Sequence, residues 1–478
     1  MGAQWDIVHL DLAEGLAPPS TGGRGVFAVL WWRQIPLGQL QIAAGRESMT
    51  SGELATEVLQ AITPALEGYL AGSRATLPRR LPDADPWRLL RVALSLLDSL
   101  AVQNRSPEST SSLPSISVVV PTCDRPDRLS ACLRSLAALE EQPLEILVVD
   151  NAPSAATRDV VESFPGVRYL AETRRGSSAA RNTGVHHCRG ELVAFVDDDE
   201  VVHPQWLRRL RACFADPEIA LATGLVLPSE LETEAQQIFE QRYSFARGYV
   251  TRTFDSELYR STRNRGVPVW EIGGSGNMAI RRRVFERLGG FDERLGAGRA
   301  GGCEELELFY RALAEGWSCR YEPRAVTEHQ HRRSAEELEH QLYAYMRGHV
   351  ASALVQLAHT RDLGNVRHLL WTLPKVYAGY ALRCALGDPA YRARLLAKEI
   401  AGSFAGLGYY RRHRHLAAHP GLGEQGLSGE HGLSGEHGLL GEHGLLGEHG
   451  LLSDHRNESS VLGEPSTVGA PASTVAGG

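Results

Sequence analysis

Apolar residues follow two different periods in the central part of the chain. Short runs that are mostly apolar alternate with segments in which apolar residues recur every three or four positions. The first pattern predicts buried strands and the second predicts helices. The predicted strands lie at 116–120, 144–149, 167–170 and 192–196, and the predicted helices at 129–139, 157–163 and 178–187. Strands that alternate with helices indicate an α/β fold with a mainly parallel sheet covered on both faces.

The first 103 residues show a different pattern, which predicts a small N-terminal α+β domain. Residues 26–32 form an apolar, strand-like run, and residues 37–42 alternate as a half-buried strand does. We expect Ile35 and Pro36 to form the turn between these strands. Apolar residues that recur every three or four positions then predict an amphipathic helix. These residues are Leu54, Val58, Ile62, Leu66 and Tyr69.

Three further regions complete the predicted organisation. Residues 104–114 are rich in Ser and Pro and are expected to link residues 1–103 to the α/β domain at 115–333. Residues 334–412 predict a helical extension with many arginines. We favour packing of this extension against the α/β domain, and a peripheral membrane contact is the alternative. Residues 413–478 hold repeats of the form Gly-Leu-x-Gly-Glu-His and are expected to be a low-complexity, disordered tail.

Composition and charge exclude several classes of protein. The chain is 43% hydrophobic and 22% charged, as is ordinary for a globular protein, and its formal net charge of −7 argues against nucleic acid as a partner. Seven dispersed cysteines without a CxxC pair indicate neither a disulfide framework nor a thiolate zinc site. The sequence shows no signal-peptide pattern and no apolar stretch of about 18 residues. We therefore expect a cytoplasmic protein, with the inner face of the membrane as the alternative, and we predict no oligomeric state.

An acidic run after the fourth predicted strand is the strongest candidate for a functional site. Asp197, Asp198 and Asp199 directly follow the apolar residues 192–196, and Asp150 ends the second strand in the same way. Ligands on parallel sheets bind at the carboxyl ends of the strands. Grouped carboxylates repel one another unless a cation is present, and their oxygens are suited to Mg²⁺ or Mn²⁺. In a reaction that releases a diphosphate, such a cation neutralises the negative charge of the leaving group. A solvated acidic turn is the alternative interpretation of the run taken alone.

Several motifs, in a fixed order, resemble glycosyltransferase family 2, an inverting family with the GT-A fold. They include Pro121-Thr122-Cys123-Asp124, Val148-Val149-Asp150-Asn151, Ala180-Arg181-Asn182-Thr183-Gly184, Phe195-Val196-Asp197-Asp198-Asp199, Gly302-Cys303-Glu304-Glu305-Leu306-Glu307-Leu308 and Glu328-His329-Gln330-His331. Each motif is weak alone, but their order across residues 115–333 is specific. The resemblance implies a nucleotide-sugar-binding GT-A domain that transfers a sugar to a hydroxyl acceptor, which the sequence does not identify.

The resemblance also assigns roles at the nucleoside end of the donor. Thr122 and Asp124 match positions that contact the nucleoside, and Asp150 matches the aspartate that binds the base. For Asp150, a cap of the following turn is the alternative. Arg181 matches an arginine near the diphosphate. The implied co-substrate is a nucleotide sugar.

The implied metal site lies in the acidic run. Asp197 and Asp199 match the outer pair of the family's DxD motif, with Asp199 the better ligand and Asp198 on the donor side. His329 or His331 matches a late ligand of the metal or the diphosphate, although an ordinary surface histidine is the alternative for His329. The implied cofactor is Mg²⁺ or Mn²⁺.

Glu305 occupies the position of the catalytic base, which removes the proton of the acceptor hydroxyl in an inverting single displacement. The family usually has Asp there, so the longer side chain displaces the carboxylate by about one methylene. Either the acceptor is placed differently, or Glu304 shares the role, or activity is reduced. A non-catalytic relative that binds a sugar nucleotide or a glycan is therefore the alternative to a hexosyltransferase-like enzyme.

Two other classes of nucleotide-binding enzyme fit less well. A nucleotidyltransferase should carry a glycine-rich phosphate loop after the first strand, and residues 121–128 contain no glycine. A dinucleotide-dependent dehydrogenase needs a GxGxxG motif at the same turn, where it is absent.

Overall fold

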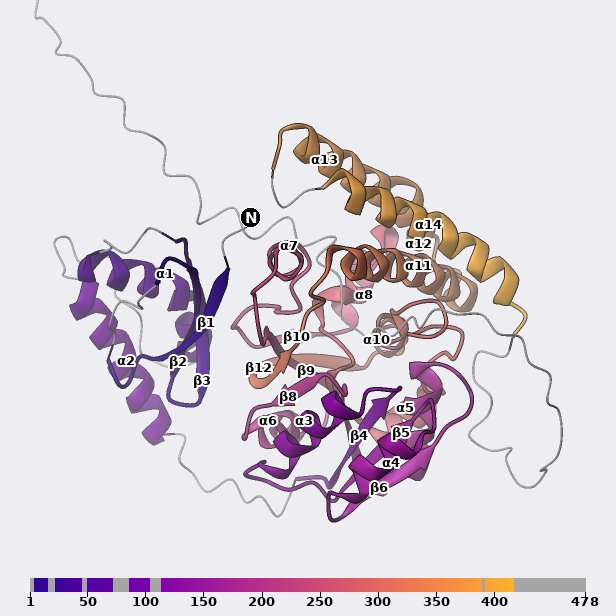
Figure 1. The fold of residues 1–478 in the computed structure, drawn as a ribbon, viewed down its shortest axis with the longest axis horizontal. Coiled ribbons are helices and arrows are strands. Elements are labelled where there is room, and N and C mark those ends of the chain that lie inside the picture. The colour runs from indigo at the N-terminus through magenta and orange to yellow at the C-terminus, as the bar shows by residue number, and fades with distance from the viewer. Residues whose placement is uncertain are drawn as a thin grey trace, which may run out of the picture.

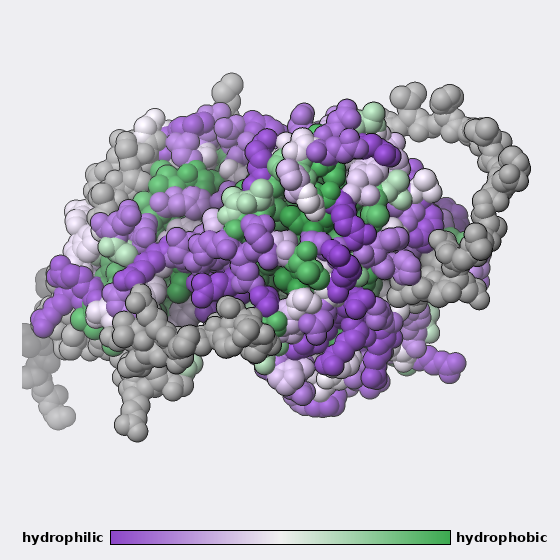
Figure 2. All heavy atoms as spheres, turned by 90° about the horizontal axis from the view of Figure 1, so that it is seen from below, coloured by the Kyte–Doolittle hydropathy of each residue, from purple (hydrophilic) through white to green (hydrophobic). Residues whose placement is uncertain are grey.

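The computed structural model describes residues 4–15, 22–44, 50–71, 86–103, 113–388 and 392–416. Most of the expected linker at 104–114, the hexapeptide repeats and nearly all of the expected tail at 413–478 lie outside these ranges. Figure 1 shows a small N-terminal sheet with two helices beside a larger central sheet, and a group of long C-terminal helices along the edge of the molecule. The face seen from below is mostly hydrophilic, with smaller areas of hydrophobic side chains between (Figure 2).

The N-terminal sheet has three strands, with the fully buried β2 in the middle. β1 pairs with β2 in parallel, and β3 pairs with it in antiparallel orientation. Thr50 and Glu53 form a capping box at the start of the first helix, which satisfies free backbone N–H groups there. The elements are β1 (Trp5–Asp11), β2 (Gly25–Trp32), β3 (Ile35–Ile42), α1 (Ser51–Leu70) and α2 (Pro86–Gln103).

The expectation of a turn at Ile35 and Pro36 is wrong. The turn is formed by Arg33 and Gln34, and Arg33 has a φ of 57°. Pro36 lies inside β3 and pairs with Trp31. A proline is tolerated there because β3 is an edge strand. No further strand lies on its outer side, so the missing N–H of the proline loses no hydrogen bond to a neighbouring strand there.

The central sheet is mixed and has nine strands. Its strands are β4 (Ile116–Thr122), β5 (Glu145–Asp150), β6 (Val167–Ala171), β7 (Leu192–Val196), β8 (Glu200–Val202), β9 (Ile219–Pro228), β10 (Arg252–Phe254), β11 (Asn277–Arg281) and β12 (Ser318–His329). Their order is β10-β12-β9-β11-β7-β4-β5-β6, with β8 beside β12. The strands from β7 to β6 are parallel, as expected, whereas β11 runs antiparallel to both neighbours. 

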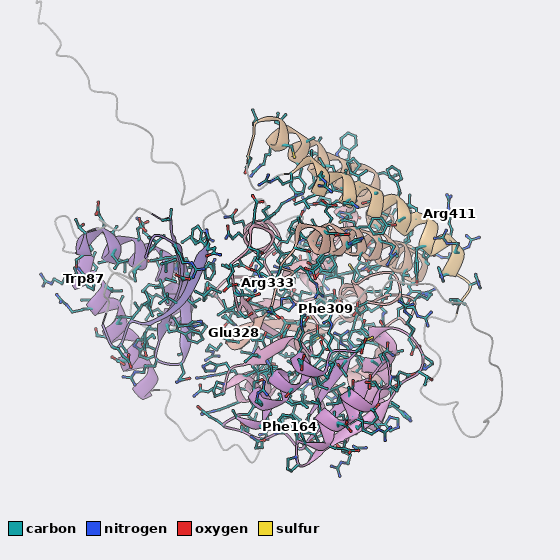
Figure 3. All side chains as sticks on the ribbon, viewed as in Figure 1. Trp87, Phe164, Phe309, Glu328, Arg333 and Arg411 are labelled. Carbon is teal, nitrogen blue, oxygen red and sulfur yellow. The ribbon has the colours of Figure 1, made fainter. Side chains whose placement is uncertain are left out.

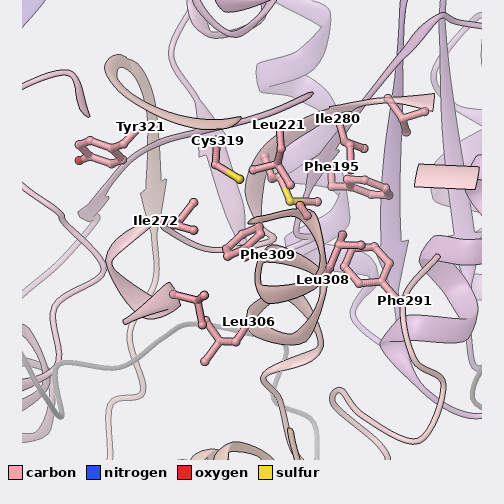
Figure 4. Close-up of a cluster of buried hydrophobic side chains, with 14 of the residues drawn as sticks. Phe195, Leu221, Ile272, Ile280, Phe291, Leu306, Leu308, Phe309, Cys319 and Tyr321 are labelled. Carbon is pink, nitrogen blue, oxygen red and sulfur yellow. The ribbon is translucent and has the colours of Figure 1, made fainter. Parts of the chain in front are cut away.

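Helices cover both faces of this sheet, and alternate residues of one strand enter opposite cores. Val119 of β4 belongs to one apolar cluster, whereas Val118 and Val120 belong to the other. Figure 4 shows the first cluster, in which Phe195 and Ile280 of the sheet lie near Phe309. The flanking helices are α3 (Pro126–Ala137), α4 (Ala155–Glu162), α5 (Ser177–His187), α6 (Trp206–Ala212), α7 (Glu234–Arg242), α8 (Ser256–Thr262), α9 (Arg282–Leu288) and α10 (Glu304–Ala314).

We expect Ile280→Val to lower the free energy of unfolding by about 0.5–1.5 kcal/mol, because it removes one methylene from a fully buried position in β11. Urea denaturation followed by circular dichroism measures the loss. Leu144, which is 51% exposed, is the control, and Leu144→Ala should change stability by less than about 0.5 kcal/mol. Equal losses in the two variants would contradict the placement of Ile280 in the core.

The C-terminal helices follow β12. They are α11 (Ala335–Thr360), α12 (Leu363–Arg367), a π-helical turn at His368–Thr372, α13 (Leu373–Ala385) and α14 (Ala393–His413). One apolar cluster joins Leu342 of α11 and Tyr380 of α13 to Phe239 of α7, so the helices pack against the sheet-bearing part of the chain. Within the described ranges, none of the helices combines the length and the hydrophobicity needed to cross a membrane.

Candidate active site

The acidic run lies where a central parallel strand ends. β7 ends at Val196, and Asp197, Asp198 and Asp199 lead into Glu200 at the start of β8. All four carboxylate residues are buried, with exposures between 0% and 7%. Buried carboxylates are costly unless donors or cations surround them, so their neighbours decide what the site can bind.

Arg181 of α5 connects the run to the first turn of α10. Its fully buried guanidinium donates to Asp197 Oδ1 at 2.6 Å and to Glu304 Oε1 at 2.8 Å. Ser177 Oγ donates to the same Glu304 oxygen at 3.0 Å. Burial acts to lower the pKa of Arg181, but the negative charges of Asp197, Glu304 and Glu305 outweigh it and raise the pKa. The structure thus brings together residues that lie more than 100 positions apart in the chain.

Two arginines that sequence reasoning missed, Arg125 and Arg128, neutralise the rest of the run. Arg125 Nη1 lies 3.2 Å from Asp198 Oδ1 and 2.9 Å from Asp199 Oδ2, and Arg128 Nη1 lies 3.1 Å from the same Asp199 oxygen. Thr122 Oγ1 donates to Asp198 Oδ2 at 2.8 Å. Arg125 lies in the loop after β4, and Arg128 lies in the first turn of α3 that follows it. That position at the carboxyl end of a strand was the signal that could have identified them.

His329 and His331 lie together at the end of β12. His329 Nε2 is 3.8 Å from Asp199 Oδ1, and its Nδ1 is 3.0 Å from Nδ1 of His331. His331 Nε2 is in turn 3.0 Å from Glu240 Oε2 of α7, a residue that the sequence did not indicate. Glu328, the neighbour of His329, lies on the side of the central sheet nearer the N-terminal sheet (Figure 3). Both histidines are buried, so His329 is not an ordinary surface histidine.

Burial and neighbouring charges shift the pKa values of the site residues in different directions. It raises the pKa of Asp197 to about 7 and that of Asp198 to about 6, although an arginine opposes each shift. Burial also acts to raise the pKa of Asp199, but Arg125, two other arginines and His329, which is charged only at such low pH, hold it at about 2. Because burial lowers the pKa of His329 to about 3, that ring is neutral at pH 7 and the arginines supply the charge. A neutral imidazole is the form that binds a metal.

Several buried atoms around the run lack a hydrogen-bond partner. They are Asp197 Oδ2, Asp199 Oδ1, Glu200 Oε2, Glu304 Oε2 and His329 Nε2. Such atoms are rare in folded proteins, and each needs an explanation such as a bound ion or ligand. Carboxylate oxygens with one imidazole nitrogen fit Mn²⁺, and the oxygens alone fit Mg²⁺. Among the described residues, no three Asp, Glu, His or Cys side chains form a preassembled metal cage. A cation that is shared between one or two carboxylates and the phosphates of a substrate does not require such a cage.

The first turn of α10 carries three fully buried glutamates, Glu304, Glu305 and Glu307. The partial positive charge of a helix N-terminus favours carboxylates at these positions. Arg181 is ion-paired with Glu304, and Arg311 Nη2 lies 2.6 Å from Glu307 Oε2. Arginines therefore engage the glutamates on both sides of Glu305.

Asp150 and Asp124 lie in the loops beside the acidic run. Asp150 accepts hydrogen bonds from the N–H groups of Ala152 and Ser154, at 3.0 and 3.2 Å, and from the hydroxyl of Tyr169 at 3.0 Å. It therefore caps the turn after β5, and its binding of a base stays a prediction. Asp124 is exposed in the loop after β4 with a φ of 54°. No hydrogen bond connects it to the run, so the structure does not bring it into the cluster.

Buried carboxylates, arginines and unpaired ligand atoms gather at the strand ends of an α/β sheet, and their charge and chemistry are suited to a cation and a phosphate-bearing ligand. Residues 117–289 match the family model described as glycosyl transferase family 2. The chain thus carries, within its α/β domain, a segment that is similar to glycosyl transferase family 2. The expected fold class, an α/β GT-A sheet flanked by helices and followed by a helical region, is confirmed. The matched residues include the acidic run and end before α10 and the histidines.

Over the aligned residues, relatives are about a quarter identical to this chain. The pre-mycofactocin glycosyltransferase of Mycobacterium tuberculosis is 28% identical over 294 residues, which are 60% of this chain and 56% of that protein. The succinoglycan biosynthesis protein ExoO of Rhizobium meliloti is 28% identical over 322 residues, 62% of this chain and 88% of that protein. The solved mannosyltransferase PcManGT of Pyrobaculum calidifontis, in complex with GDP-Man and Mn²⁺, is similar with a TM-score of 0.42 and 20% identity, over 62% of this chain and 87% of that one. The chain thus spans only about half the length of the first of these relatives.

Proposed function

We propose that this chain is a glycosyltransferase that moves a sugar from a nucleotide-sugar donor to a hydroxyl acceptor, with Mg²⁺ or Mn²⁺ at the acidic run. One observation carries the proposal: the unpaired buried atoms Asp197 Oδ2, Asp199 Oδ1 and His329 Nε2 belong to residues that family resemblance assigns to the metal. The match of residues 117–289 to the family model and the relatives named as glycosyltransferases support it.

In this proposal, Asp197 and Asp199 hold the cation, with His329 as a further ligand. When bound, the cation would offset the charge of the leaving diphosphate. His331 and Glu240 orient His329 through its other ring nitrogen, as outer partners of metal-binding histidines commonly do. On this basis we assign the ligand role to His329 and the positioning role to His331.

The donor's nucleoside end is assigned to the loops after β4 and β5. Thr122 and Asp198 are hydrogen-bonded to each other and border the diphosphate, and Asp124 and Asp150 lie in the loops where a nucleoside would bind. Arg125 lies between these loops and the acidic run, so it is a further candidate contact for the diphosphate.

Glu305 is the proposed catalytic base. As the acceptor oxygen attacks the anomeric carbon, Glu305 takes the hydroxyl proton, and the bond from that carbon to the diphosphate oxygen breaks. Glu304 is already ion-paired with Arg181, so we assign it the positioning of that arginine and not a shared role as base. Attack from the side opposite to the leaving group makes the transfer an inverting single displacement.

A screen of donor hydrolysis over several nucleotide sugars, with Mn²⁺ or Mg²⁺, tests the proposal. We expect metal-dependent release of the nucleoside diphosphate from at least one donor. If no donor binds with or without metal, the proposal fails. Donor binding without turnover, unchanged in Glu305→Gln, would instead identify a non-catalytic relative that binds sugar nucleotides.

We expect Mn²⁺ with a nucleoside diphosphate to raise the melting temperature of the chain more at pH 8 than at pH 6. Metal binding requires ionised ligands, and the pKa of Asp197 is about 7, so protons compete with the cation as the pH falls. Differential scanning fluorimetry measures the shift. Asp197→Asn should abolish it, whereas Asp159→Asn, at an exposed position in α4, should not. An equal shift in both variants would contradict ligation by Asp197.

A further inference from the structure

The last helices of the described chain expose apolar side chains. Eleven large apolar side chains are exposed in the described residues, and eight of them lie between positions 363 and 416. We name the six that are exposed by 60% or more the α13–α14 surface: Leu363, Leu370, Trp371, Leu382, Leu386 and Phe404. Concentrations of this kind mark surfaces that meet another molecule or a membrane, whereas singly scattered apolar residues do not.

The helices that carry these exposed side chains are nevertheless well packed on their other side. Tyr380 of α13 is 2% exposed within the apolar cluster shared with α11. The hydroxyls of Tyr377 in α13 and Ser403 in α14 lie 2.8 Å apart and join the two helices. Trp371 and Leu382, at 70% and 60% exposure, point away from this packed side. Figure 1 places α13 and α14 at the edge of the molecule, outside α11.

The same segment is strongly basic, although the chain as a whole is acidic. Residues 361–416 contain ten Lys or Arg and three Asp or Glu, a formal net charge of +7 in a chain of −7. Two of the three acids are turned inward: Asp362 accepts from Tyr310 at 2.8 Å, and Glu399 accepts from Arg242 at 2.7 Å. The outer side is therefore positive. Its exposed basic residues include Arg361, Arg367, Lys375, Arg411, Arg412 and Arg414, whereas the exposed Arg392 and Arg394 are ion-paired with Glu234 and Glu339.

We propose that the α13–α14 surface docks onto an anionic lipid bilayer. Exposed Trp and Leu side chains would enter the boundary between headgroups and acyl chains, while the surrounding Lys and Arg contact lipid phosphates. Figure 3 shows Arg411 on α14 at the edge of the molecule. Charge complementarity favours this occupant over a second copy of the chain, because two positive surfaces would repel each other.

Docking would also bring part of the candidate active site toward the bilayer. Tyr409, near the end of α14, donates its hydroxyl to the carbonyl oxygen of Arg294 at 2.9 Å. Arg294 lies in the loop that leads to Glu304 and Glu305. The docking itself does not depend on the proposed function, since lipid binding needs neither donor nor metal.

Flotation of the full chain with lipid vesicles tests the inference. We expect binding to phosphatidylcholine vesicles that contain phosphatidylglycerol, with weaker binding at high salt and little binding to phosphatidylcholine alone. The triple variant Trp371→Ser, Leu382→Ser, Phe404→Ser should bind about a hundredfold more weakly, because three apolar contacts are lost. Arg411→Gln with Arg412→Gln should weaken binding by about tenfold or more.

Matched controls come from surfaces far from these helices. Leu144→Ser removes an exposed apolar side chain, and Arg88→Gln with Arg91→Gln removes two exposed charges from α2. Neither should change vesicle binding. Unchanged melting temperature and donor binding in the triple variant separate lost docking from misfolding and from failure of the proposed function.

Three outcomes would overturn the inference. The first is equal binding to neutral and anionic vesicles, and the second is vesicle binding that the triple variant retains. The third is a dimer in analytical ultracentrifugation that the triple variant abolishes while no vesicles bind. In that case, the α13–α14 surface meets a second copy of the chain.

Discussion

Glu305→Gln is expected to lower the rate of sugar transfer by about two to four orders of magnitude, the usual contribution of a general base. The amide is nearly the same size as the carboxylate but cannot accept the acceptor's proton. Glu305 lies in the buried first turn of α10, whereas the nucleoside is assigned to the loops after β4 and β5, so donor affinity should stay within about twofold. Turnover rates and calorimetric donor titration, both at saturating metal, measure the two effects separately.

Two further variants sharpen this test. Glu305→Asp keeps a carboxylate but withdraws it by about one methylene, and a loss of up to about a hundredfold would show that the base is placed for Glu. Glu315→Gln, at the exposed end of the same helix, should leave the rate unchanged. Full activity in Glu305→Gln would place the base elsewhere.

The buried strands of the central sheet could be predicted because their signal is local. Residues 144–149 are apolar except for Glu145, and residues 192–196 are apolar throughout. Each strand lies between two others in a sheet covered on both faces. The place of Asp197 also followed from local pattern, since a polar residue that ends a buried strand must lie at the edge of the sheet. The contact between Asp197 and Arg181, by contrast, could be expected only from the order of the family motifs.

Other features depend on contacts that no sequence spacing reveals. Arg125 and Arg128 pair with carboxylates more than 70 positions away, and an arginine after a strand does not indicate its partner. β1 has no strong strand pattern, and it is stabilised by its parallel pairing with β2. Glu240 reaches His331 from α7, in a region without a readable motif. These features arise from tertiary packing, which is why the pattern of single residues did not predict them.

Arg181→Met should destabilise the chain by about 3–5 kcal/mol, the usual cost of removing one partner from a buried ion pair. Arg181 is fully buried and donates to both Asp197 and Glu304, so its loss leaves two carboxylates without their cation. Methionine is of similar length and apolar, which limits any cavity. Urea denaturation in the presence of EDTA measures the change without a contribution from bound metal.

The pH dependence of this loss identifies its electrostatic origin. The pKa of Asp197 in the folded chain, about 7, already exceeds its ordinary value of 3.8, and loss of the Arg181 charge raises it further. A group whose pKa is higher in the folded state than in the unfolded state stabilises the fold when protonated, so this contribution is lost as the pH rises through the folded-state pKa. Arg181→Met should therefore be less destabilised at pH 5 than at pH 8. The control Arg260→Met removes an exposed arginine and should change stability by less than about 0.5 kcal/mol at either pH. A loss in Arg181→Met that is the same at both pH values would assign the effect to packing and not to the unpaired carboxylates.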